Sequence, residues 1–345
     1  MIHNFYPGPS TLHPYFEDAV QSAIYSGILS MNHRSSAFSS LYEECYELLR
    51  HKWNIPKDYR LLFVSSATET WEIIAQSLIA NEPSLHIYNG AFGKKSYDVA
   101  RKLTSLAEEF SFPYYEKLNI DSIEEYPFIN ICQNETSNGT AISNSSLNLL
   151  RSKFADSIIS VDVTSSLGGT VLDFSAADIW YGSVQKCLGL PSGMGLIFIN
   201  DKAIDKVKSK NINLHYNDFM NLITNAKKWQ TTHTPNILNI HALKYTQSKT
   251  EGIKRIDEQL KKRKQKVLNY LPEYELLTKT HEATSSSILT FDHQYPELII
   301  DEGLHNNIII GKGYGTWKGN TFRIANFPSI SDNSFDVLLR FLKRQ

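Results

Sequence analysis

An aspartate and a lysine occupy comparable places in two neighbouring stretches of the sequence. Asp162 closes a run that begins with Ile158 and Ile159 and is typical of a buried strand. Lys186 comes shortly after a second short apolar run, residues 179–181. Parallel strands deliver the residues at their carboxyl ends to one edge of a sheet. We therefore expect this carboxylate and this amine to meet in one site.

A buried amine and a carboxylate are the two groups that pyridoxal phosphate requires from a protein. A lysine holds the cofactor's aldehyde as a Schiff base, and a carboxylate keeps the ring nitrogen protonated so that the ring accepts electrons. We assign the first role to Lys186 and the second to Asp162. Taken alone, Lys186 also fits an ordinary solvated lysine, and Asp162 an ordinary turn aspartate. Against that interpretation stand the apolar flanks of Lys186, where an unpartnered ammonium is unfavourable, and the glycines that follow at 189, 193 and 195.

Five motifs follow one another along most of the chain. They are Asn4-Phe5-Tyr6-Pro7-Gly8-Pro9-Ser10, Asn32-His33-Arg34-Ser35-Ser36-Ala37-Phe38, Asn134-Glu135-Thr136, the stretch 160–169 with Gln185-Lys186, and Phe322-Arg323-Ile324. In this order they resemble the class V aminotransferases, a branch of the fold type I pyridoxal-phosphate enzymes. The resemblance implies a transaminase acting on small amino and keto acids, and a homodimer with shared active sites.

The elements that must position these residues form an α/β pattern. Strand-like and helix-like stretches alternate from Tyr59 to Asn200, which predicts a doubly wound, mostly parallel sheet. With the resemblance, this gives a fold type I transferase with a large domain over residues 13–235. A smaller α+β domain is expected over residues 236–345, together with the N-terminal arm 1–12. Its predicted strands lie near 287–291, 298–300, 308–310 and 321–324.

Further cofactor contacts are predicted at turns that follow strands. Ala67-Thr68-Glu69 opens a helix, and the amides and dipole of a helix amino terminus suit a phosphate, although this local sequence also describes an ordinary capped helix. The resemblance implies that Phe92 stacks on the cofactor ring and that Thr136 bonds the ring hydroxyl. Gln185 is expected to help Thr68 hold the phosphate. His233-Thr234 is expected to reach the partner subunit's cofactor phosphate.

Substrate contacts are predicted from cationic residues outside this group. An arginine inside the short apolar run 321–324 is unfavourable unless it is paired, and a guanidinium pairs naturally with a carboxylate. We therefore expect Arg323 to bind the substrate's α-carboxylate. The loop segment His33-Arg34 lies near the substrate in the family. Lys312, in the glycine-rich stretch 311–319, is a candidate for an additional anionic group.

Two branches of the family fit the chain. Residues 7–10, His33-Arg34 and residues 55–63 are similar to phosphoserine aminotransferases, which exchange an amino group between glutamate and 3-phosphohydroxypyruvate. Residues 165–169 and 186–191 are closer to alanine–glyoxylate or serine–pyruvate aminotransferases. We favour the first branch. A cysteine desulfurase of the same fold is disfavoured because no cysteine follows residue 187, and a non-catalytic scaffold is a remote alternative.

Composition narrows the remaining classes of partner, location and site. Thirty-five basic against 36 acidic residues give a formal charge of −1, so nothing favours nucleic acid or a membrane surface as a partner. No apolar run approaches the roughly 20 residues that span a bilayer, and the first residues lack a secretory pattern. Three scattered cysteines suggest neither a disulfide framework nor a metal site. We expect a cytoplasmic protein.

Overall fold

The protein is described by a computed structural model that covers residues 2–212, 215–278 and 283–345. Its larger sheet has seven strands in the order β2-β10-β9-β8-β5-β3-β4. Their bounds are β2 (Tyr59–Val64), β3 (Ser84–Tyr88), β4 (Ala107–Ser111), β5 (Phe128–Cys132), β8 (Ile158–Asp162), β9 (Ile179–Ser183) and β10 (Gly195–Asn200). Strand β10 runs antiparallel to both of its neighbours, and the other neighbouring pairs are parallel. This confirms the predicted α/β fold with a mostly parallel sheet.

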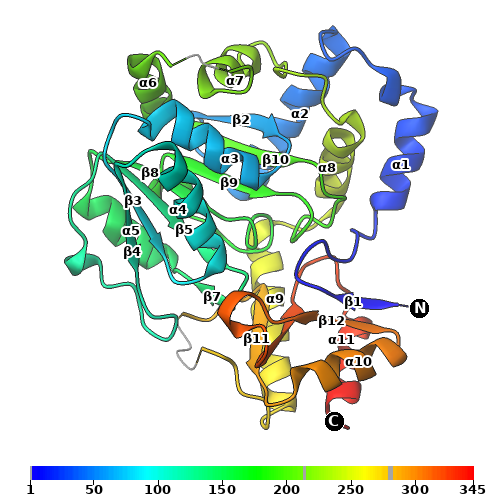
Figure 1. Cartoon of the computed structure of the whole chain (residues 1–345). Coiled ribbons are helices and arrows are strands. Elements are labelled where there is room, and N and C mark those ends of the chain that lie inside the picture. The colour runs from blue at the N-terminus through cyan, green and yellow to red at the C-terminus, as the bar shows by residue number, and fades with distance from the viewer. Residues whose placement is uncertain (1, 213–214, 279–282) are drawn as a thin grey trace.

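Helices pack around the larger sheet (Figure 1). Most begin at a side chain that caps the first turn. In α2, for example, the Ser35 hydroxyl accepts a hydrogen bond from the Phe38 amide, and the helix ends at Asn54 in the left-handed conformation. The helices of this part are α1 (Phe16–Tyr25), α2 (Ser36–Trp53), α3 (Ala67–Ile74), α4 (Ala91–Leu103), α5 (Asn144–Lys153), α6 (Asp201–Lys210), α7 (Phe219–Ala226) and α8 (Ile237–Lys249).

A second sheet of four strands follows the order β1-β12-β13-β11. Its first strand comes from the N-terminal arm and lies beside β12 of the C-terminal part (Figure 1). The strands are β1 (His3–Phe5), β11 (Ile288–Asp292), β12 (Ile308–Lys312) and β13 (Thr321–Ala325), and a short hairpin of β6 (Asn134–Glu135) and β7 (Thr140–Ala141) stands apart. The helices are α9 (Ile253–Tyr270), α10 (Pro296–His305) and α11 (Asp332–Leu342).

One predicted strand of this second part is wrong. Residues 298–300 belong to helix α10, which begins with a proline in its first turn. Its buried residues are Pro296, Ile299, Ile300 and Gly303, a helical spacing. A short apolar run does not by itself distinguish a strand from a buried helix face.

The described residues form two hydrophobic cores, one around each of the two sheets. The first extends through the larger sheet and includes Ile240 and Leu243 of α8. The second surrounds the smaller sheet and includes Phe5 from the arm. Helix α9 contributes Ile253 to the first core and Val267 to the second. The predicted domain boundary near residue 235 remains a prediction. Helix α8 lies on the C-terminal side of that boundary but packs with the larger core.

Candidate active site

Lys186 lies in a tight turn after β9, at the carboxyl end of the parallel strands. Its side chain is buried, with 8% of its surface exposed. The amine donates hydrogen bonds to the hydroxyls of Thr136, at 2.7 Å, and Ser165, at 2.8 Å. Burial lowers the pKa of Lys186 to about 8, and the nearby carboxylates of Asp162 and Glu135 oppose this decrease. A substantial fraction of the amine is therefore neutral near pH 8.

Asp162 is the last residue of β8, and the register places it opposite Tyr181 of β9. One carboxylate oxygen accepts the Thr164 amide at 2.9 Å, and the other accepts the Trp71 indole N–H at 3.2 Å. Burial raises the pKa of Asp162, while the bonds from Thr164 and the charge of Lys186 oppose this increase. The predicted carboxylate and amine thus interact electrostatically at neighbouring strand ends.

The aromatic ring of Phe92 lies beside the lysine. Its centroid is 5.2 Å from the Lys186 Nζ atom. Phe92 stands in the first turn of α4, whose amides are capped by the buried Glu135 carboxylate: Phe92 N donates at 3.1 Å and Gly93 N at 3.0 Å. A Cβ atom at Gly90 would lie 2.2 Å from the Glu135 side chain, so this close approach requires glycine. The cap fixes the place of Phe92 relative to Lys186.

Arg323 reaches the same site from β13 and is 3% exposed. Its Nε donates to the Lys312 carbonyl at 2.8 Å and its Nη1 to the Thr136 carbonyl at 2.9 Å. Burial lowers the pKa of Arg323 to about 10. The guanidinium is therefore held by neutral carbonyls, which leaves its charge available for an anionic ligand. The Lys312 side chain points elsewhere and pairs with Glu297 of α10 at 3.3 Å.

The N-terminal arm lies directly over the lysine. A Cβ atom at Gly8 would lie 3.0 Å from the Lys186 Cε atom, and Gly8 adopts a φ of +136°, which side chains rarely allow. The amide of Ser10 donates to the Gln185 carbonyl at 3.3 Å. The arm after β1 therefore covers the lysine, and β13 of the same sheet supplies the arginine.

The predicted phosphate cradle at the start of α3 is largely occupied by the protein's own groups. The Ala67 amide donates to the Ser183 hydroxyl at 2.7 Å, and the Glu69 amide to the Ser66 hydroxyl at 3.0 Å. Thr68 is exposed. The Glu69 carboxylate accepts the Ser65 amide at 2.6 Å. A phosphate bound here would lie beside this carboxylate, so this end of the predicted site fits the cofactor less well than the lysine end.

The remaining predicted residues form a second group. The Arg34 Nη1 donates to Asn225 at 2.9 Å and to Gln230 at 2.8 Å, and the Thr234 hydroxyl lies 3.4 Å from a ring nitrogen of His33. Burial lowers the pKa of His33, and the charges of Arg34 and His233 lower it further. No described contact joins this group directly to Lys186. It is connected to α3 by a chain of side-chain hydrogen bonds that runs from His233 through Thr232 and Asn217 to Glu69.

Several site residues were missed by the sequence reasoning. The Ser165 hydroxyl and the Trp71 indole contact the two central residues, and the Glu135 carboxylate caps α4. Ser165 lies in the stretch 160–169 and Glu135 in Asn134-Glu135-Thr136, so their places in these motifs were a usable signal. Trp71 lies in a helix and its partner is 91 residues away, and no local pattern indicates that contact.

The residues at the lysine end fit pyridoxal phosphate. A buried amine of lowered pKa, a buried carboxylate and a flat aromatic ring surround one place, as the cofactor's aldehyde, ring nitrogen and ring face require. This donor set matches the cofactor better than a metal, and no cluster of three or more metal-ligating side chains is found in residues 2–212, 215–278 and 283–345.

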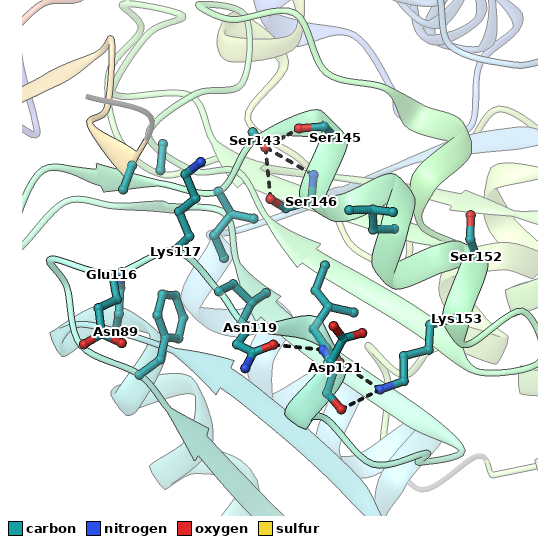
Figure 2. Close-up of a pocket in the computed structure, with 17 residues that line it drawn as sticks. Asn89, Glu116, Lys117, Asn119, Asp121, Ser143, Ser145, Ser146, Ser152 and Lys153 are labelled. Atoms are coloured by element: carbon teal, nitrogen blue, oxygen red, sulfur yellow. Dashed lines mark hydrogen bonds between the residues drawn. The ribbon is translucent and has the colours of Figure 1, made fainter. Parts of the chain in front are cut away.

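A separate cavity of about 670 Å³ contains none of the predicted site residues (Figure 2). Ser143 and Ser146 at the start of α5 and Lys153 at its end line it. Their polar atoms are satisfied internally: Ser143 caps the helix (Figure 2). The Lys153 amine donates to the carbonyls of residues 120, 121 and 123. This cavity gives no support to a second reactive site.

Comparisons with known proteins give the family and the fold of this chain. The family model described as aminotransferase class V matches residues 4–299. A phosphoserine aminotransferase of Lactococcus lactis subsp. lactis (strain IL1403) is 26% identical, over 99% of this chain and 98% of that protein. The crystal structure of a phosphoserine aminotransferase from Cytophaga hutchinsonii has a TM-score of 0.94 and 29% identity, and the match covers 100% of this chain and 99% of that one.

A second solved structure shares the fold at lower identity. An alanine–glyoxylate aminotransferase from Nostoc sp. has a TM-score of 0.87 and 22% identity, over 100% of this chain and 95% of that chain.

Among the helices that the structure describes, none has both the length and the apolar character needed to span a membrane.

Proposed function

Since this chain belongs to the class V aminotransferase family and is a transaminase, we propose that it exchanges an amino group between glutamate and 3-phosphohydroxypyruvate. The observation that carries the chemistry is the buried Lys186 amine, held by two hydroxyls beside Asp162. The choice of substrate is supported by the relatives at 26% and 29% identity, both phosphoserine aminotransferases, whose lengths this chain matches. An alanine–glyoxylate or serine–pyruvate exchange is the alternative, favoured by the pairing of Lys312 with Glu297.

Each residue of the site has its own role in the proposed reaction. Pyridoxal phosphate, when bound, supplies an electron sink that stabilises negative charge at the substrate's α-carbon. The Lys186 amine takes the proton from that carbon and returns it, and its pKa of about 8 suits both directions. The hydroxyls of Thr136 and Ser165 orient the amine. Asp162 holds the proton on the ring nitrogen, Phe92 provides a surface for the ring, and Arg323 binds the α-carboxylate.

The other predicted contacts belong to the cofactor's phosphate and to a partner subunit. We assign the phosphate to Ala67-Thr68-Glu69 and Gln185. We propose that His233-Thr234 and His33-Arg34 complete the site of a second copy in a homodimer. Within one chain no contact among the described residues joins them to Lys186, which supports this arrangement.

The test is an amino-transfer assay on the purified protein with added pyridoxal phosphate. We expect faster turnover of glutamate with 3-phosphohydroxypyruvate than of alanine or serine with glyoxylate. Lys186→Ala should abolish transfer and remove the visible absorbance of the bound cofactor. Lys264→Ala is the matched control, because burial lowers the pKa of Lys264 to about 8 as well, and this variant should stay active. Transfer at the normal rate by Lys186→Ala would refute the mechanism, and faster glyoxylate turnover would reverse the choice of substrate.

A further inference from the structure

Lys95 of α4 lies against two stacked aromatic rings at the edge of the candidate site. Phe92 and Tyr314 stack with their centroids 4.9 Å apart and their planes at 15°. The Lys95 Nζ atom lies 4.9 Å from the Tyr314 centroid and 5.5 Å from the Phe92 centroid. It also forms a hydrogen bond with the Tyr314 hydroxyl. The Lys95 ammonium is therefore held by Phe92 from its own helix, α4, and by Tyr314 from the segment that follows β12.

The same two rings connect Lys95 to the reacting groups. The Lys186 amine is 5.2 Å from the Phe92 centroid, so both ammonium nitrogens lie within 5.5 Å of one point. The Arg323 guanidinium carbon lies 5.4 Å from the Tyr314 centroid. Lys95 and Lys186 thus contact the same Phe92 ring, and Lys95 and Arg323 contact the same Tyr314 ring, so Lys95 lies beside the place where a substrate bound by Lys186 and Arg323 would extend.

Lys95 has no carboxylate within ion-pair distance among the described residues. Its neighbour Lys94 does, because Asp98 lies 2.7 Å from it, and Lys312 pairs with Glu297 at 3.3 Å. The Tyr314 hydroxyl uses one of the three hydrogens of the Lys95 ammonium. Two donors and a full positive charge therefore remain for an incoming anion.

We propose that Lys95 is a specificity-determining residue that binds a second anionic group of the substrate, and that Tyr314 positions it. The shared chemistry is an oxyanion at the far end of a short side chain: a phosphate monoester or a side-chain carboxylate. The inference rests on the proposed transaminase function and names the residue that selects acidic over apolar substrates. It replaces Lys312, which Glu297 neutralises, as the cation contributed by the same chain.

The experiment compares Lys95→Met with Lys94→Met in the full-length protein loaded with pyridoxal phosphate. The amino donors are phosphoserine, glutamate and alanine, of which only the first two carry a second anion. For Lys95→Met we expect KM for the acidic donors to rise so that their kcat/KM relative to alanine falls about tenfold, as for one lost charge-assisted bond. Lys94→Met should leave this ratio unchanged. Lys95→Arg should restore part of it, and Tyr314→Phe should lower it less than Lys95→Met.

The outcomes separate binding from a structural role. If only phosphoserine is affected, the bound group is the phosphate; if only glutamate, it is the carboxylate; both results support the inference. A Lys95→Met variant that slows all three donors equally would show that Lys95 only fastens Tyr314 to α4, and would overturn it, as would an unchanged ratio. Wild-type protein that transfers from none of the donors would instead refute the proposed function itself.

Discussion

Lys186 is a positive group placed where its charge is poorly solvated. Its pKa of about 8 lies below the ordinary lysine value of 10.5 because burial disfavours the ammonium. The folded protein therefore binds fewer protons than the unfolded chain between these two pH values, and stability should rise with pH across that interval. Below pH 8 the full penalty for the buried charge applies, and above 10.5 none of it does.

We predict that Lys186→Met stabilises the cofactor-free protein near pH 7 by up to about 3 kcal/mol, because it removes this penalty. The advantage over wild type should shrink from pH 8 upward and vanish above 10.5. Urea unfolding of both proteins at several pH values measures it. A difference that stays constant with pH would contradict the buried, partly neutral amine.

Arg323 makes a second prediction at this scale. Arg323→Gln should raise KM for every amino-acid substrate roughly a hundredfold, since a buried cation paired with a carboxylate is lost. Arg263→Gln is the control: that arginine pairs with Asp332 at 2.8 Å and should affect stability without changing KM. Steady-state kinetics distinguish the two. An unchanged KM in Arg323→Gln would remove the carboxylate from this position.

The sequence indicated the central residues because their types and their places after apolar runs were both local. The sequence did not show to which face of the sheet each side chain points. In the pairing of β12 with β13, Gly311 lies opposite Arg323 and Lys312 opposite Phe322. Since successive residues of a strand face opposite sides, Lys312 points away from the face that carries Arg323. A glycine-rich stretch does not reveal this register in advance.

At the scale of elements, the arm that carries Gly8 forms part of the site. Gly8→Ala should reduce the amino-transfer rate sharply, because the new methyl group would press on the Lys186 side chain at 3.0 Å. Gly27→Ala is the matched control, since Gly27 also has a positive φ, +68°, but nothing lies within 4 Å of the added atom. Both variants should lose about 1 kcal/mol or more of stability from backbone strain. Turnover and the visible spectrum of the bound cofactor measure the difference. Equal activity of the two would show that the arm does not position the lysine.

Elements were predictable where periodicity was long and ambiguous where it was short. The alternation over residues 59–200 indicated the mostly parallel larger sheet, whereas the antiparallel pairing of β10 appears only in the structure. The run at 298–300 was too short to identify as part of a helix. The cap on α4 could not be foreseen, because Glu135 lies more than 40 residues from the amides of Phe92 and Gly93 that it accepts.

At the scale of the whole molecule, the grouping of Arg34 with His33 and Thr234, apart from Lys186, leads to a mixing experiment. If two copies share each site, Lys186→Ala and Arg34→Ala should both be impaired alone. Unfolding and refolding them together in equal amounts should restore roughly a quarter of wild-type activity, because random pairing leaves one intact site in each mixed dimer. Activity after co-refolding, with each variant refolded alone as the control, measures this. No recovery would mean that each chain builds its own site.

The pairing of β1 with β12 also affects how the protein is made. His3 lies beside Ile308, so β1 finds its strand partner only after some 300 further residues have been translated. Until then β1 lacks its strand partner, and the arginine of β13 has not emerged. Assembly of the reactive centre is consequently a late event in biosynthesis, and stalled or truncated chains would carry the larger sheet without a complete catalytic pocket.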